Sequence, residues 1–496
     1  MRYLMGAKKL NLILISFLIA VSLAVYINSL WGEFLIDDYT GILKNEKIHD
    51  LKTFFTQDFS IRPGILTELT RALIWQIGAG KPFAFHLFSV LLHASCVLLI
   101  FILCNLIFGN RAISFLAGLI FAVHPIHTEA VSWISAGPYV FSSFWFLLAV
   151  IFYIKADRTI VNLALSIFFF SLCLLTNNTV VALPIIFAVY DLFFRRKGEA
   201  DKISLIRLRR IILSFVILIV ASVSAMFFAA RNELVHTIFS YRSPGYLIVA
   251  VKAFTYYLKI IYLPVARGLY HPFAYNTLDA DKITPAFFVS LFIIAVSIVT
   301  FLRCRKSAKP LSFGIAWFFA TYLPYSNIIP VCNIISERYV YLPTVGFSII
   351  LAYFFVRVWE IINRKSKGRK LIRPIAVAVL ILFLSSYAVS TVMRNRDYRD
   401  LFTFWETNIN NFPEGYMAYN NLAGTYYASG RFDQAISYSW INLMINPKQP
   451  HIWCNLGMVY REIGDLKQAK MCYNEALKVD AQYFPARKAL EEMDEE

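Results

Sequence analysis

Long apolar runs separated by short basic blocks dominate the first four-fifths of the chain. Apolar runs of about 18 residues or more with few charges are typical of membrane-spanning helices. The pattern predicts an all-α fold, namely a polytopic helical membrane protein. It predicts helical segments over residues 10–30, 83–107, 111–125, 138–155, 160–176, 178–194, 211–230, 246–264, 285–302, 311–326, 339–360 and 373–393.

The basic blocks between the runs predict the orientation. Cytoplasmic loops are enriched in Lys and Arg, so we expect the N-terminus and residues 195–210, 303–309 and 363–373 to face the cytoplasm. Twelve full crossings would put residues 303–309 on the opposite side. We therefore expect residues 246–264 to be re-entrant or interfacial, which leaves about eleven crossings and a non-cytoplasmic C-terminal region.

Composition and charge agree with a membrane protein. The chain has 58% hydrophobic and only 16% charged residues, whereas a soluble domain has about 45–50% and about 25%. Its net charge of +17 is concentrated in the short basic blocks, which is the pattern of membrane topology and not of a nucleic-acid-binding patch. The seven cysteines show no metal-type or redox spacing.

A repeat begins after Arg399, where the composition changes. The stretch from Tyr419 aligns with the stretch from Trp453, a spacing of 34 residues. The matched positions are Leu422/Leu456, Tyr426/Tyr460, Gly430/Gly464 and Ala435/Ala469. The spacing and these residues resemble tetratricopeptide (TPR) repeats. We predict a transmembrane domain over 1–398 and a TPR domain over 399–496, with about two and a half repeats.

The first domain begins with a long outer loop, residues 31–82, whose segments 54–59 and 65–77 we expect to form short amphipathic helices at the membrane surface. This loop carries two adjacent acids, Asp37 and Asp38, directly after the first apolar run.

Other ionisable residues collect on the same predicted side of the membrane. They are Arg62, His93, His124, His127, Glu129, Arg242, Glu337 and Arg338. Taken singly, each has an ordinary explanation, such as a solvated turn, a hydrogen-bonded buried histidine or an ion pair between Glu337 and Arg338. Charged groups at membrane depth are costly and are functional candidates by default. The convergence of these ionisable residues on one side of the membrane indicates a functional site.

Several motifs occur in a characteristic order: DDYTGILKN, RPG, FHLFSVLLH, FAVHPIHTEAVSWIS and SERYVYLPTVGF, followed by the repeats. This order resembles the transmembrane and TPR-repeat-containing protein O-mannosyltransferases of the GT-C glycosyltransferase superfamily, and the resemblance covers essentially the whole chain. It implies a GT-C-like fold and transfer of a sugar, mannose, from a polyprenyl-phosphate donor to a Ser/Thr hydroxyl of a protein. It also implies inversion at the anomeric carbon and a catalytic base in the first outer loop, so Asp37 and Asp38 both remain candidates.

The chemistry of such a transfer asks for residues that the chain contains. The attacking hydroxyl must lose a proton to a carboxylate, and cations must stabilise the departing phosphate. We predict Arg338 as the first choice of cation, with Arg62 and Arg242 as alternatives. We expect the donor phosphate or sugar to be oriented by His93, His124, His127, Glu129 and Glu337.

The chain departs from the family at one motif. The relatives continue "WIS" with a charged stretch, whereas residues 135–139 carry no charge, so family contacts there are not carried over. Two adjacent carboxylates could hold a divalent cation, Mg or Mn, but the lack of a third nearby acid favours a metal-independent enzyme. The short repeat region favours a bacterial protein of the inner (cytoplasmic) membrane, with its site and repeats in the periplasm and the repeats guiding the protein acceptor.

Two alternatives stay open. The same fold could act on a glycolipid or cell-envelope acceptor, or the chain could be a non-catalytic membrane scaffold whose repeats recruit partners. A transporter is disfavoured because the charged residues stop at the outer half of the spans. No nucleic-acid partner is expected.

Overall fold

A computed structural model describes residues 2–58, 61–156, 159–177, 181–194, 246–262, 285–304, 308–327, 333–365 and 371–495. Arg242 and the predicted segment 211–230 lie outside these ranges. Within them every regular element is helical, as the apolar pattern predicted. The described residues fall into two compact units, one that ends at Arg396 and one that begins at Asp397.

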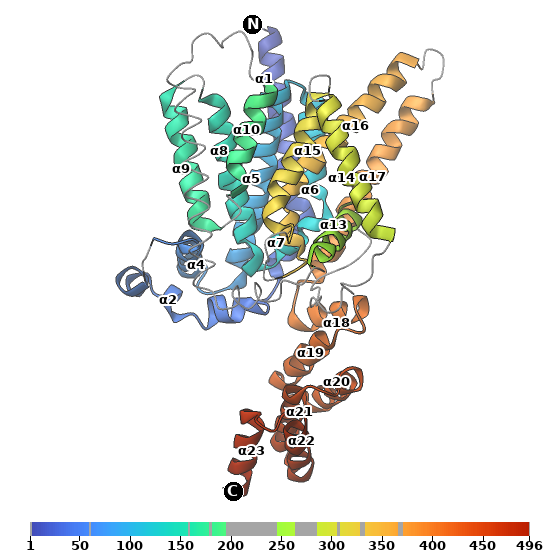
Figure 1. Cartoon of the computed structure of the whole chain (residues 1–496). Helices are drawn as coiled ribbons and strands as arrows, with labels where there is room; N and C mark the ends of the chain where they lie inside the picture. The colour runs from blue at the N-terminus through green and yellow to red at the C-terminus, as the bar shows by residue number, and fades with distance from the viewer. Residues whose placement is uncertain are drawn as a thin grey trace. The chain divides into compact units, whose positions relative to one another are not determined.

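The first unit is built from long helices that run roughly side by side (Figure 1). They are α1 (Arg2–Tyr26), α5 (Pro82–Phe108), α6 (Arg111–Val123), α8 (Pro138–Lys155), α9 (Ile160–Thr176), α10 (Leu183–Phe194), α13 (Tyr246–Tyr262), α14 (Pro285–Cys304), α15 (Lys309–Tyr322), α16 (Pro343–Lys365) and α17 (Ile372–Arg396).

Shorter elements connect these helices. They are η1 (Ile27–Trp31), η2 (Tyr39–Leu43), α2 (Glu46–His49), α3 (Leu51–Thr53), η3 (Phe54–Asp58), α4 (Ile65–Ile77), η4 (Pro125–His127), α7 (Thr128–Ser132), η5 (Ile134–Ala136), η8 (Leu323–Tyr325) and η9 (Glu337–Val340). Helices α2, α4 and α7 lie at the end of the bundle opposite the N-terminus (Figure 1).

Five segments of the described part are long and apolar enough to cross a membrane: Leu10–Trp31, Pro82–Phe108, Ile134–Lys155, Pro343–Arg364 and Ile372–Arg396. A sixth arises if α6 and Pro125–Ser132, which meet at an angle of 51°, form one broken span. Pro125 explains the break, because proline lacks an N–H donor and clashes with the preceding turn. The polytopic character is confirmed, whereas the number of eleven crossings stays a prediction.

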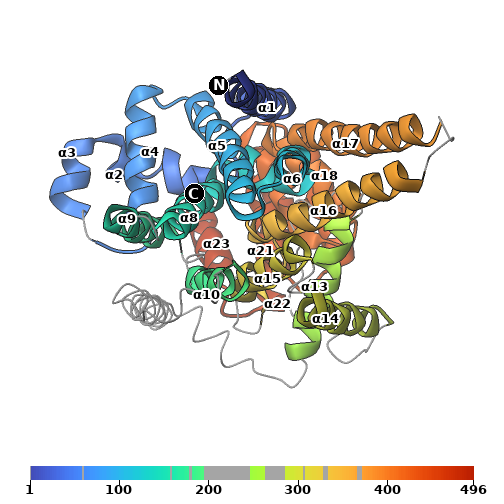
Figure 2. The same ribbon diagram turned by 90° about the horizontal axis from the view of Figure 1, so that it is seen from above.

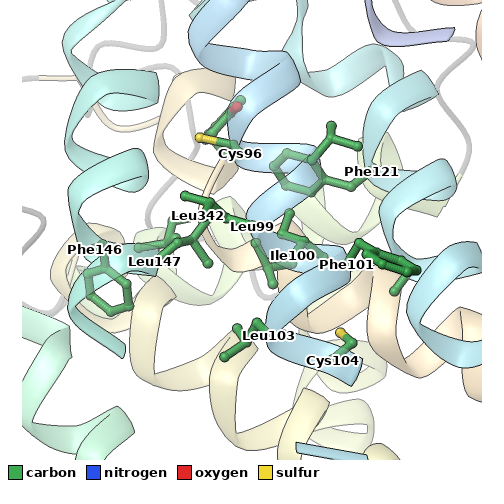
Figure 3. Close-up of a cluster of buried hydrophobic side chains, with 14 of the residues drawn as sticks. Cys96, Leu99, Ile100, Phe101, Leu103, Cys104, Phe121, Phe146, Leu147 and Leu342 are labelled. Atoms are coloured by element: carbon green, nitrogen blue, oxygen red, sulfur yellow. The ribbon is translucent and has the colours of Figure 1, made fainter. Parts of the chain in front are cut away.

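The core of the first unit surrounds α5 and α6. Helices α1 and α8 pack against α5, and α16 and α17 pack against α6 (Figure 2). Figure 3 shows side chains of α5 such as Cys96, Ile100 and Cys104 together with Phe121 of α6 and Phe146 of α8, and all five are fully buried. Helix α5 is apolar on all sides, which is typical of a buried or membrane-spanning helix.

Two glycines let α15 and α16 approach closely. A Cβ atom added to Gly314 of α15 would lie 2.8 Å from the carbonyl oxygen of Gly346 on α16. Small residues at such crossings are common in membrane helices because they allow backbone contact. The crossing fixes the beginning of α16, which directly follows the SERYVYLP motif.

The first outer loop is tied to the end of α9. Gly64, with φ 92°, lies just before α4, and its N–H donates to the carbonyl of Leu175 at 2.9 Å. The Thr67 hydroxyl of α4 donates to the carbonyl of Thr176 at 3.2 Å. Helix α4 covers the residues predicted for it and is held against the bundle.

The second unit consists of helical hairpins. Its helices are α18 (Leu401–Asn411), α19 (Tyr416–Ala428), α20 (Phe432–Ile445), α21 (Pro450–Glu462), α22 (Leu466–Val479) and α23 (Phe484–Glu495). Gly430 and Gly464 take positive φ of 73° and 84° at the two hairpin turns, a conformation that glycine adopts without strain. The matched core positions Leu422/Leu456 and Ala435/Ala469 are all fully buried. The predicted repeat is confirmed.

Candidate active site

The two adjacent acids face different surroundings. Asp37 is exposed, whereas Asp38 is fully buried. The residue before them, Ile36, has φ +35°, which is rare for a β-branched residue. Such strain persists only where neighbouring contacts impose it, and it is concentrated at functional sites. Here the Asp38 Oδ2 atom accepts a hydrogen bond from the Leu35 N–H at 2.9 Å and so closes the strained turn.

The second oxygen of Asp38 connects the outer loop to the loop before α8. Its Oδ1 atom accepts a short hydrogen bond from the Ser135 hydroxyl. Burial raises the pKa of Asp38 to about 6, while the bonds from Ser135 and Leu35 and the charge of Arg71 act in the opposite direction. Asp38 is therefore a fixed carboxylate that gains its charge near neutral pH.

Gly32 and His86 hold the beginning of this loop against α5. The His86 Nε2 atom lies 3.2 Å from the Gly32 carbonyl oxygen. A Cβ atom on Gly32 would lie 2.9 Å from the same nitrogen. Only glycine leaves room for this contact, which positions the chain shortly before the acids.

Glu129 and Arg338 form a second charged cluster. Glu129, on α7, accepts from the Ser336 hydroxyl at 2.6 Å and from the Arg338 N–H at 3.2 Å. The Arg338 guanidinium lies 3.3 Å from the same carboxylate and 5.1 Å from the Trp133 ring. Burial works against the charge of Arg338, but charge interactions, of which that with Glu129 is the largest, outweigh it, so the pKa of Arg338 is raised. The motifs HPIHTEAVSW and SERYVYLP therefore meet in one charged cluster.

Asp37 interacts electrostatically with two arginines, Arg71 near Asp38 and Arg338. Its charge favours the charged forms of both Arg338 and Arg71. The exposed acid of the first outer loop is therefore within electrostatic reach of two guanidiniums, one from η9 and one from α4. The roles predicted for Asp37 and Arg338 stay predictions.

Glu337 and Arg338 do not pair with each other. Glu337 forms a buried ion pair with Arg394 of α17, and both side chains are almost fully enclosed. Neighbouring residues of one turn thus point to partners on different elements. Glu337 attaches the η9 turn to α17 and leaves Arg338 directed at Glu129.

The three candidate histidines are fully buried. His93 contacts the Tyr341 hydroxyl at 2.8 Å, and His127 contacts Thr344 Oγ1 at 2.6 Å. His124 accepts from the Ile126 N–H at 3.2 Å, so its other nitrogen donates to the Ile261 carbonyl at 3.1 Å. Their described contacts are with protein groups around the bend between α6 and α7, and they hold the segment that presents Glu129.

The remaining candidates lie elsewhere. Arg62 is exposed and pairs with Glu68 at 2.6 Å, and Arg242 falls outside the described ranges. Among the residues that the structure describes, no group of three or more His, Cys, Asp or Glu side chains is arranged to hold a metal ion.

Sequence reasoning missed Arg71 and Ser135. Arg71 lies on α4 close in sequence to Thr67, Glu68 and Thr70, so the sequence did not distinguish it from other polar residues of this helix. Ser135 belongs to the uncharged stretch that departs from the family motif. The sequence signal for Ser135 was a short polar side chain directly after Trp133 and Ile134. Its partner, Asp38, lies 97 positions away, so the pairing could not be predicted.

The fold defines the class of protein: a polytopic helical membrane protein with a carboxylate–guanidinium cluster, followed by helical repeats. A tetratricopeptide repeat model matches residues 450–483. The chain is 27% identical to mouse "Protein O-mannosyl-transferase TMTC3", over 96% of this chain and 55% of that protein. It is 26% identical to the human protein of that name, over 97% and 56%, and 24% identical to Drosophila melanogaster "Protein O-mannosyl-transferase Tmtc3", over 93% and 58%.

The chain spans about half the length of the curated relatives it matches. The similarity nevertheless covers almost all of this chain. The resemblance drawn from the sequence motifs is thereby confirmed, since the homologues over most of the chain are proteins named protein O-mannosyl-transferases.

Proposed function

We propose that the protein is an integral-membrane glycosyltransferase of the GT-C type. It transfers mannose from a polyprenyl-phosphate donor to a Ser/Thr hydroxyl of a protein on the non-cytoplasmic face. The observation that carries this proposal is the exposed carboxylate of Asp37, directly before the enclosed and doubly hydrogen-bonded Asp38, in a membrane bundle that also contains the Glu129–Arg338 ion pair. The homologues' names support the sugar and the acceptor.

Asp37 is the base in this proposal and Asp38 is a positioning residue. A base must reach the acceptor hydroxyl, and Asp37 is the exposed acid. Both oxygens of Asp38 are already engaged by Leu35 and Ser135. The hydroxyl oxygen forms a bond to the anomeric carbon, its proton passes to Asp37, and the bond from that carbon to the phosphate oxygen breaks with inversion. The polyprenyl monophosphate leaves.

Arg338 is the proposed cation for the charge that develops on the departing phosphate. Glu129 and the Trp133 ring hold its guanidinium in place, and it retains 13% side-chain exposure. We assign a positioning role to the remaining candidates. They hold the motifs HPIHTEAVSW and SERYVYLP in place, and they are Glu337, His93, His124 and His127. Arg62 and Arg242 remain alternatives for the phosphate.

The proposed location is a bacterial inner membrane, with the site and the repeats in the periplasm. The repeats guide the protein acceptor. We expect transfer without a bound metal, so addition of a chelator leaves the rate unchanged, whereas loss of transfer that Mg²⁺ or Mn²⁺ restores contradicts this part.

The test is sugar transfer by the purified full-length protein in detergent, with labelled polyprenyl-phosphate mannose and periplasmic extract. Asp37→Asn should lower the rate at least about 100-fold. Glu46→Gln, an exposed carboxylate in the same loop, is the matched control and should transfer normally. Label in lipid instead of protein would favour the glycolipid acceptor. If no donor supports transfer and Asp37→Asn complements a deletion strain, the scaffold alternative holds.

A further inference from the structure

The last turn of α17 is enclosed although most of the helix is not. Only 11% of the apolar stretch of α17 is buried within the protein. In the last turn, by contrast, Arg394 and Asn395 are 1% and 2% exposed, and the helix packs against η1, η4 and α7. Polar and charged residues that a membrane helix encloses are costly and are functional candidates by default. The polar end of α17 therefore indicates a function besides spanning the membrane.

Asn395 ties the beginning of the first outer loop to α17. Its Nδ2 atom donates to the Val25 carbonyl at 2.7 Å and to Asn28 Oδ1 at 2.8 Å. In return, Asn28 Nδ2 donates to the Val392 carbonyl of α17 at 2.9 Å. A carbonyl only accepts hydrogen bonds, so Val25 fixes which side of the Asn395 amide carries the nitrogen. The segment that leads into the acid pair is thus held by α17.

The other side of the same amide holds α7. The Asn395 Oδ1 atom accepts from the Ser132 hydroxyl at 3.0 Å. Ser132 is 1% exposed and ends the helix that carries Glu129. It directly precedes Trp133, whose ring lies 5.1 Å from the Arg338 guanidinium. One carboxamide therefore lies between the loop of the acid pair and the helix of the second charged cluster.

The neighbouring Arg394 reaches the third segment of the candidate site. It forms the enclosed ion pair with Glu337, the residue directly before Arg338 in η9. Two adjacent residues of one helical turn thus contact all three segments that carry the candidate base, its cation and the carboxylate that holds the cation.

The carboxamide of Asn395 fits its partners, and an isosteric carboxylate does not. The amide nitrogen donates to two acceptors while the amide oxygen accepts. Satisfied buried networks of this kind fix one arrangement of the segments that they join. In Asn395→Asp an oxygen replaces Nδ2, so the Val25 carbonyl and Asn28 Oδ1 lose their donor and face an acceptor. The substitution changes the hydrogen bonds and leaves the volume almost unchanged.

We infer that Asn395 is a positioning residue of the candidate active site. It holds α7 and the segment before the acid pair at a fixed separation, and so sets the position of Asp37 relative to Arg338 without touching the reactants. Its effect on sugar transfer rests on the proposed function, whereas its effect on the two segments does not. A displacement of about 1 Å can lower a rate about 100-fold, so a residue outside the reaction centre can control kcat.

The test combines hydrogen exchange, read by mass spectrometry, with transfer kinetics of the full-length protein in detergent. Asn395→Asp should speed exchange in both 25–38 and 128–136. It should lower kcat per folded protein at least about tenfold and change the donor KM by less than about threefold. The matched control is Ser166→Ala on α9, which removes an enclosed hydroxyl that donates to the Ala149 carbonyl at 2.8 Å. It should speed exchange only around α8 and α9 and leave kcat unchanged.

A second variant separates the two sides of the amide. Ser132→Ala removes only the bond to α7, so exchange should rise in 128–136 and stay as in wild type in 25–38. This variant also decides the matter should Asn395→Asp not fold. Exchange that rises in both segments, or in neither, would contradict the assigned contacts.

The kinetic results separate this inference from the proposed function. If wild type transfers sugar and Asn395→Asp keeps its kcat, or if Ser166→Ala loses as much, the positioning role is refuted and the enzyme stands. If wild type transfers no sugar while Asn395→Asp speeds exchange in both segments, the proposed function fails and the junction of the segments at Asn395 is upheld. Unchanged exchange in either segment of Asn395→Asp refutes the junction itself.

Discussion

The loop that carries Asp37 and the segment that carries HPIHTEAVSW use their polar residues in opposite ways. Every residue from Phe121 to Ile134 is buried, and the polar groups there bond inward, as when Ser132 donates to Asn395. In the loop, Asp38 is enclosed while its neighbour Asp37 is exposed. The residues of the conspicuous motif are enclosed, and the less specific acid pair contains the exposed carboxylate.

The ion pairs show the same difference. Glu337 and Arg394 are enclosed by protein, whereas Arg62 and Glu68 keep 45% and 30% side-chain exposure. Both pairs join a carboxylate to a guanidinium, so their surroundings alone distinguish them. Four predictions test this contrast between enclosed and exposed positions.

The largest effect is expected from Glu337→Gln. The change breaks the enclosed ion pair between Glu337 and Arg394, and breaking such a buried pair should cost about 3–5 kcal/mol of unfolding free energy. Denaturant unfolding of the detergent-solubilised protein measures the loss. The double change Glu337→Leu with Arg394→Leu should recover most of it. A single variant as stable as wild type would show that the pair is not enclosed as described.

Next in size is a pH effect at Asp38. The pKa of Asp38 is raised from 3.8 to about 6, so the folded protein holds a proton that the unfolded chain has lost between these values. The contribution of Asp38 to stability should therefore be greatest below about pH 4 and fall as pH rises from about 4 to 6, by at most about 3 kcal/mol. In Asp38→Asn this contribution to the slope should vanish. Unfolding free energies of both proteins from pH 4 to 7 measure it, and identical slopes would contradict the assignment.

A smaller loss is expected from Gly346→Ala at the crossing of α15 and α16. The added Cβ would lie 2.7 Å from the Phe318 nitrogen, so the helices must separate, at about 1–3 kcal/mol. Gly424→Ala on α19 meets nothing within 4 Å and should gain about 0.5–1 kcal/mol as its matched control. Thermal unfolding of both variants measures the difference, and equal effects would mean that the helices do not touch there.

The smallest effect concerns the exposed pair. Arg62→Gln should change the unfolding free energy by less than about 1 kcal/mol, because solvent screens such pairs. The same denaturant assay used for Glu337→Gln provides the comparison. A loss as large as that of Glu337→Gln would remove the distinction between the two pairs.

Local pattern predicted the helices well. Apolar spacing gave α4 over residues 65–77, and the repeat period gave the hairpins α19–α20 and α21–α22. These features depend on neighbours within one or two turns. The motif order also brought Asp37 and Arg338 together as candidates.

The partners of the charged residues could not be predicted, because they depend on packing between distant segments. Glu337 lies 57 positions from Arg394, and Asp38 lies 97 positions from Ser135. The sequence shows two equivalent aspartates, and only the three-dimensional arrangement encloses one and exposes the other. Arg71 was missed for the same reason, since its interaction with Asp38 depends on how α4 packs beside the acid pair.

The central claim is that the exposed acid acts as the base and the enclosed acid holds it in place. The most direct measurement compares transfer of labelled mannose from polyprenyl phosphate by Asp37→Asn and Asp38→Asn in folded, donor-binding protein. We predict that Asp37→Asn loses transfer at least about 100-fold at every pH, while Asp38→Asn keeps measurable transfer. Loss of transfer in Asp38→Asn together with full activity of Asp37→Asn would contradict the claim.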